Sequence, residues 1–66
     1  MYQNLRAEMA RKNVTQKSLA AILGITSQAF WKKLKGFSPF TWDETLTIKS
    51  YLNVDLPMEV LFRKDA

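Results

Sequence analysis

The fold is decided by residues 15–36, which read TQKSLAAILGITSQAFWKKLKG. Thr15 precedes one run of helix-forming residues, and Thr26 precedes a second. A threonine in such a position can accept a hydrogen bond from the backbone of the first helical turn. The spacing therefore predicts two consecutive helices, the first over residues 16–23 and the second over residues 27–35.

Three small or apolar residues fit a steep crossing of these two helices. Gly24 follows the first helix and can adopt the positive φ of a tight turn. Small Ala20 lets the second helix approach closely, and Ile25 fills the angle between the two helices. We therefore expect two helices that cross steeply through a turn of three to four residues.

The rest of the chain also favours short helices. Residues 3–12 are rich in helix formers, and residues 41–44 have the Thr-x-x-Glu pattern of a capping box, which predicts a helix that Asn53 ends. Pro57 is placed in the first turn of a short last helix. No segment is convincing as a strand. We expect an all-α fold, a compact five-helix bundle in which residues 1–66 form a single domain.

The 66 residues include no Cys and no His. Their absence excludes a disulfide framework and removes the commonest metal ligands together with the commonest general base. Asp43 and Glu44 are neighbouring carboxylates, but they suit the positive end of a helix dipole better than a catalytic pair. We therefore expect no enzymatic activity, no metal and no cofactor.

Membrane and export signals are missing as well. No run of about 18 apolar residues is present to span a bilayer. Residues 1–10 carry Arg6 and Glu8 and lack the long apolar centre of a signal peptide. We expect a soluble intracellular protein without a membrane partner.

Charge is distributed unevenly along the chain. Ten basic and six acidic residues give a formal net charge of +4. Residues 9–42 contain six of the bases and no acid, so they carry +6, whereas the remainder carries −2. A basic block of this kind indicates a surface that faces a polyanion. The alternative is a solvated basic face that has no partner.

Residues 15–36 resemble the helix-turn-helix motif of the phage repressor and Cro-like (XRE-type) family, whose domains have the lambda-repressor-like fold. The resemblance implies a sequence-specific regulator of transcription that binds double-stranded DNA, with residues 27–35 in the major groove. It places such a protein in the cytoplasm of a bacterial host. The residues that carry the resemblance are Thr15-Gln16, Leu19-Ala20, Gly24-Ile25-Thr26, Phe30 and Gly36.

On a helical wheel, Phe30 and Leu34 share one face of the second motif helix, and the opposite face is polar and basic. The resemblance implies that this polar face reaches base edges through Ser27, Gln28 and Lys32. A Gln side chain can pair with adenine, and a Lys side chain with guanine. Contacts to the DNA backbone are expected from Gln16, Lys17, Thr26 and Lys35.

The large side chains near this face leave alternatives open. Trp31 could stack against sugar-phosphate, contact a thymine methyl group, or fold sideways onto the packing edge. Lys33 is expected to lie over the edge of the core. Phe37, Phe40 and Trp42 are expected to pack the fourth helix onto the bundle.

One departure from the family concerns packing. Many relatives join the first helix to the recognition helix through a buried Arg and Glu, and the corresponding residues here are Met9 and Leu34. Apolar packing can replace a buried ion pair without loss of stability. We therefore expect Met9 to contact Leu34.

One recognition helix covers only a few base pairs, so we expect two copies on a palindromic operator. Apolar residues crowd near the C-terminus, where dimer contacts are expected from Met58, Leu61 and Phe62. The alternative is that Val60 or Leu61 closes the core of the monomer, and both can hold at once. The working hypothesis is a weak homodimer, one that could form only on DNA.

The competing function is a protein-interaction module on the same scaffold, antitoxin-like or adaptor-like, with weak or no specific DNA binding. A patch of exposed aromatic residues would favour that function. A basic, acid-free outer face on the second motif helix favours DNA binding over that alternative.

Overall fold

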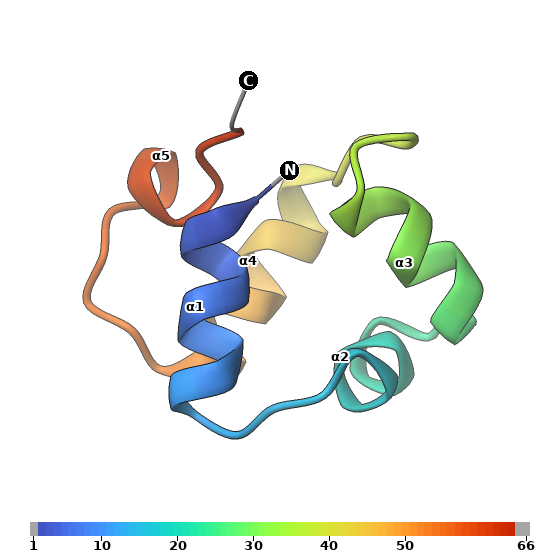
Figure 1. The fold of residues 1–66 in the computed structure, drawn as a ribbon, viewed down its shortest axis with the longest axis horizontal. Helices are drawn as coiled ribbons and strands as arrows, with labels where there is room; N and C mark the ends of the chain where they lie inside the picture. The colour runs from blue at the N-terminus through green and yellow to red at the C-terminus, as the bar shows by residue number, and fades with distance from the viewer. Residues whose placement is uncertain (1, 65–66) are drawn as a thin grey trace.

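The computed structural model describes residues 2–64, and all regular structure in that range is helical. In Figure 1, α1 lies in front of α4, with α2 and α3 on one side and α5 on the other. α4 contacts both α2 and α5, so it joins the two sides. The expected all-α bundle of five helices is confirmed. The helices are α1 (Gln3–Arg11), α2 (Gln16–Leu23), α3 (Ser27–Leu34), α4 (Trp42–Leu52) and α5 (Met58–Leu61).

The two central helices begin at the threonines that the sequence indicates. The Thr15 hydroxyl oxygen accepts a hydrogen bond from the Ser18 N–H at 3.1 Å, and the Thr26 hydroxyl oxygen accepts one from the Ala29 N–H at 3.0 Å. Each bond satisfies a donor that the first turn of a helix leaves unpaired. The start of α2 and the start of α3 are therefore fixed by local chemistry.

Left-handed residues end several of the helices. Gly24 has the expected positive φ, +72°, after α2. Asn53 ends α4 as expected and does so with a φ of +54°. Asn13 also has a positive φ, +58°, and the sequence does not predict that it ends a helix. Asparagine tolerates this region better than most residues, and the turn it forms ends α1 at Arg11. α3 likewise ends one residue earlier than expected, at Leu34.

Side chains from all five helices meet in one core. Met9 and Leu34, between which a contact is expected, are both buried in this core and line the same surface hollow. Burying an aliphatic or aromatic side chain contributes roughly 1.5 to 3 kcal/mol. The largest fully buried side chains are Leu5, Leu19, Phe30, Ile48, Leu52 and Leu61.

An aromatic cluster closes the core where the chain passes from α3 to α4. The Phe40 ring lies edge-on to its neighbours, with centroid distances of 5.3 Å to Tyr2, 5.4 Å to Phe62 and 5.9 Å to Phe30. Such pairs add about 0.5 to 1.5 kcal/mol beyond the area they bury. The expectation that Phe40 packs against the bundle is confirmed.

The same expectation is wrong for Phe37 and Trp42, whose side chains are 73% and 65% exposed. The Phe40 ring is the one that packs against both Phe30 of α3 and Phe62 near the C-terminus. Phe37 lies in the turn that Gly36 opens with a φ of +89°. Trp42 begins α4 one turn before Thr45, the first buried residue of that helix, so it lies beyond the core.

Lys33 lies over the edge of the core, where it links α3 to α4. Its ammonium is 3.1 Å from Glu44 Oε1 and donates a hydrogen bond to the Pro39 carbonyl at 2.9 Å. Glu44 Oε1 also accepts a hydrogen bond from the Thr41 N–H at 2.9 Å, and Thr41 Oγ1 accepts one from the Glu44 N–H at 3.2 Å. The expected capping box is confirmed, and Lys33 is held away from the outer face of α3.

Glu44 gives this junction a pH dependence. Partial burial raises the pKa of Glu44, but hydrogen bonds from Thr41 and Lys33 and the charge of Lys33 outweigh it, so the pKa lies below its ordinary value of 4.5. A carboxyl group with a pKa lowered by folding stabilises the folded state above that ordinary value. The contribution is lost as the pH falls through the folded-state pKa.

We expect the urea midpoint of the natural chain to fall as the pH is lowered below 4.5, and to fall less in Glu44→Gln. At pH 7 the substitution is expected to cost less than about 1 kcal/mol, since the ion pair lies near the surface. Glu59→Gln, at an exposed glutamate in the first turn of α5, is the matched control. Equal acid sensitivity of Glu44→Gln and the natural chain would contradict the assignment.

Candidate nucleic-acid interface

α2 and α3 form a unit whose geometry is set by the turn between them. Figure 1 shows α2 nearly end-on while α3 runs across the view, so their axes cross steeply. Gly24 is left-handed, and the Ile25 N–H donates to the Ala20 carbonyl at 3.0 Å. Ile25 is half-buried against the core, as expected of a residue that fills the angle between two helices. The two helices also pack directly against each other.

α3 has a buried inner face and an exposed outer face. Phe30 and Leu34 point inward and are 0% and 2% exposed. The three side chains expected to reach base edges, Ser27, Gln28 and Lys32, are all exposed. The helix contains no acidic residue. The structure therefore brings the expected base-contact residues together on one basic surface, the outer face of α3, which Trp31 completes.

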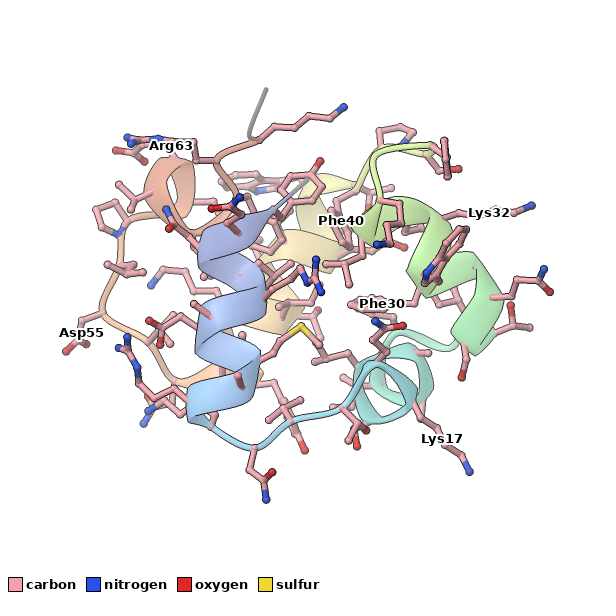
Figure 2. The ribbon with its side chains drawn as sticks, in the orientation of Figure 1. Lys17, Phe30, Lys32, Phe40, Asp55 and Arg63 are labelled. Carbon is pink, nitrogen blue, oxygen red and sulfur yellow. The ribbon has the colours of Figure 1, made fainter. Side chains whose placement is uncertain are left out.

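The cations near α2 and α3 are separated from acidic Asp55. In Figure 2, Lys17 and Lys32 point away from the bundle on the side of α2 and α3, while Phe30 lies inside it. Asp55 points outward on the opposite side, where Arg63 also lies. Arg11 and Lys12, although part of the basic block, line one hollow with Glu8 and Asp55, so the unpaired cations on the side of α2 and α3 are Lys17, Lys32 and Lys35. A field of this kind favours approach of a polyanion from the side of α3.

The four residues expected to contact the DNA backbone differ in their freedom to do so. Lys17 is exposed at the start of α2, whereas Gln16 is half-buried and lines a hollow with Met9. The Thr26 hydroxyl accepts the capping hydrogen bond, which leaves its proton available to an acceptor such as phosphate. Lys35 is half-buried and caps the end of α3.

Trp31 stays on the surface and does not join the core. Its side chain is 40% exposed, and its ring centroid lies 5.9 Å from that of Phe37. The Lys35 ammonium lies 5.9 Å from the centre of the Trp31 ring. Phe37 was expected in the core, and no signal in the sequence separates it from Phe40, since both are phenylalanines in the same loop. Its place beside Trp31 is a finding of the structure.

The residues expected at a dimer contact have different positions in the structure. Leu61 is 0% exposed, so it closes the core of the monomer and is not available to a second copy, which corrects that expectation. Phe62 is partly buried, with its ring centroid 6.2 Å from that of Tyr2, and Met58 is half-buried. Leu61 is drawn inward because α5 docks on α1, where Asn4 Nδ2 donates to the Val60 carbonyl at 2.8 Å.

Over residues 2–64, no three His, Cys, Asp or Glu side chains are grouped in a way that could hold a metal ion. Within the same range, no helix has the length and apolar character needed to cross a membrane.

Neither a protein-family model, nor a curated protein, nor a solved structure matches this chain. A function is therefore inferred from the arrangement of α2 and α3 and from the side chains exposed around them. Those grounds are an outer face of α3 that is basic and free of acids, and an inner face whose burial fixes the orientation of the helix.

Proposed function

We propose that the protein is a sequence-specific regulator of transcription that binds double-stranded DNA, of the phage Cro or repressor type, and that α3 is its recognition helix. The observation that carries the proposal is the exposed, basic and acid-free outer face of α3 beside a fully buried inner face. In this proposal α2, the turn at Gly24 and α3 act as a helix-turn-helix. The regulator would act in the cytoplasm of a bacterial host.

The dimensions and chemistry of α3 suit the major groove. An α-helix with its side chains is about 10 to 12 Å across, which matches the groove width of about 12 Å, and the 8 residues of α3 are about 12 Å long. Gln28 can form two hydrogen bonds with adenine, and Lys32 can donate to guanine. Ser27 can donate or accept. Lys17, Thr26 and Lys35 would hold the phosphates, with Gln16 at the start of α2 supporting them.

Two copies on a palindromic operator would supply the remaining specificity. Equivalent recognition helices on such a site lie about 34 Å apart. The extents of the molecule, 26 × 24 × 21 Å, let two copies sit side by side within that spacing. Met58 and Phe62, which are partly exposed at the C-terminal end, are the proposed contacts of a weak homodimer formed on DNA.

The test is to incubate the purified protein with a random duplex library and sequence the retained molecules. We expect a palindromic consensus with half-sites about 10 base pairs apart. With two phosphates neutralised by each of two copies, through Lys17 and Lys35, affinity is expected to fall about a hundredfold between roughly 50 and 200 mM salt. A retained pool with the composition of the starting library would overturn the proposal.

A protein-interaction module is the second candidate function. It is favoured by the apolar side chains that α4 exposes, Trp42, Leu46 and Tyr51. Such a module would bind duplex DNA weakly, without sequence preference, and its binding to a protein partner would depend little on salt. The same library experiment separates the two functions, since only a DNA regulator enriches a consensus.

A further inference from the structure

Trp31, Lys35 and Phe37 form a surface cluster at the end of α3, which we call the aromatic platform. The Trp31 and Phe37 rings are tilted by 46° with centroids 5.9 Å apart, and both rings are substantially exposed. The Lys35 ammonium lies 5.9 Å from the centre of the Trp31 ring, a distance that suits a cation–π contact. The two rings therefore pack on each other and leave apolar surface open to a ligand.

The platform is held in place by the backbone. The Lys32 carbonyl accepts hydrogen bonds from the Phe37 N–H at 2.9 Å and from the Ser38 N–H at 3.3 Å. Gly36, with a φ of +89°, makes the reversal that brings Phe37 back over the last turn of α3. Phe37 is thus an ordered neighbour of Trp31, although most of its ring is exposed.

The platform continues the proposed DNA-binding surface. Ser27, Trp31 and Lys35 are spaced four residues apart, so they follow one stripe along the helix. Trp31 lies about 6 Å along the axis from Ser27, less than two base-pair steps of about 3.4 Å each. A duplex that meets Ser27 and Gln28 therefore passes directly over Trp31.

The chemistry of the platform selects one feature of the duplex. Base faces are stacked in a duplex and cannot be reached by a side-chain ring. Among the base edges in the major groove, only thymine presents an apolar group, its C5 methyl. The Phe37 side chain has no polar atom, so it cannot replace the hydrogen bonds to water that a donor or acceptor edge would lose on contact. Contact with such an edge would therefore cost free energy.

We propose that Trp31 and Phe37 form the contact surface for a thymine methyl group in each half-site, which makes Trp31 a specificity-determining residue. The inference rests on the proposed function. The flanking cations Lys32 and Lys35, with no acid between residues 9 and 42, favour DNA over an apolar protein surface as the occupant. Lys35, held over the Trp31 ring, would meet the adjoining phosphate.

The test replaces each thymine of the enriched operator by deoxyuridine, which removes only the methyl group. For the natural chain we expect one position per half-site where the replacement weakens binding about fourfold, as the burial of one methyl group implies. Trp31→Ala is expected to bind the thymine operator more weakly and to show no preference for thymine over deoxyuridine there. Phe37→Ala, at a residue 73% exposed and therefore harmless to folding, is expected to reduce the same preference.

Trp42→Ala is the matched control, because it removes an exposed tryptophan from α4 and leaves the platform intact. It should keep the full preference for thymine. An enriched half-site without thymine, a natural chain indifferent to every deoxyuridine, or a preference that survives in both Trp31→Ala and Phe37→Ala would overturn the inference and leave the proposed function standing. A library without any enriched consensus would overturn both.

Discussion

Phe30→Ala is expected to lower the free energy of unfolding by about 3 to 5 kcal/mol, the loss typical of a fully buried aromatic ring. The Phe30 side chain is 0% exposed and lies edge-on to Phe40, with centroids 5.9 Å apart. A chain of 66 residues has only about 3 to 10 kcal/mol of stability in total. The substitution is therefore expected to remove between about a third and all of that stability.

Circular dichroism during thermal and urea unfolding measures this loss. The thermal midpoint is expected to fall by well over 10 °C, since a domain of this size loses roughly 4 to 8 °C per kcal/mol. Trp42→Ala is the control, because its side chain is 65% exposed and its loss should change stability by no more than about 0.5 kcal/mol. Similar midpoints for Phe30→Ala and Trp42→Ala would show that the inner face of α3 is wrongly assigned.

The helices could be predicted closely because their ends depend on nearest neighbours. Thr15 and Thr26 cap the turns that follow them, and Gly24 takes the left-handed conformation that the turn requires. Each of these interactions joins residues at most five apart in sequence, so a local pattern is enough to predict it. The left-handed conformation of Asn13 cannot be predicted in this way, because that region is optional for asparagine and depends on how the chain leaves α1.

The aromatic residues show where local patterns fail. Phe37 and Phe40 are the same residue type in one loop, yet Phe37 is 73% exposed and Phe40 packs against Tyr2 and Phe62. The partners of Phe40 come from the two ends of the chain. Only the assembled fold brings these partners together, so the pattern within residues 37–42 cannot show which of the two phenylalanines is buried.

The sequence predicts part of the candidate interface, namely which side chains of α3 are exposed. The exposure of Gln28 and Lys32 opposite Phe30 follows from the helical period alone. The burial of Leu61 does not, since it depends on α5 docking against α1. The ion pair between Lys33 and Glu44 joins two helices through a loop, so its partner could not be named from sequence. Periodicity thus fixes which face is presented, and tertiary contacts decide which cations remain on it.

Gln28→Ala and Lys17→Ala are expected to weaken binding to the selected operator in two different ways. Gln28 is exposed on the outer face of α3, and a bidentate contact with adenine is worth about 1 to 3 kcal/mol of discrimination. Its loss is expected to weaken operator binding roughly five- to a hundredfold and to relax the preference at one base pair per half-site. Lys17, exposed at the start of α2, is expected to contribute equally to all sequences, and its loss should reduce the salt slope by about one unit per copy.

The measurement is titration of each variant against the operator, single-base variants of it and an unrelated duplex, at several salt concentrations. Arg63→Ala is the control, since it also removes one positive charge but lies on the opposite side of the molecule from Lys17 (Figure 2). It is expected to leave both affinity and salt slope nearly unchanged. If Gln28→Ala weakened every duplex by the same factor, α3 would not be the element that distinguishes bases. If Lys17→Ala and Arg63→Ala behaved alike, attraction would come from net charge alone, and the side occupied by α2 and α3 would have no special role.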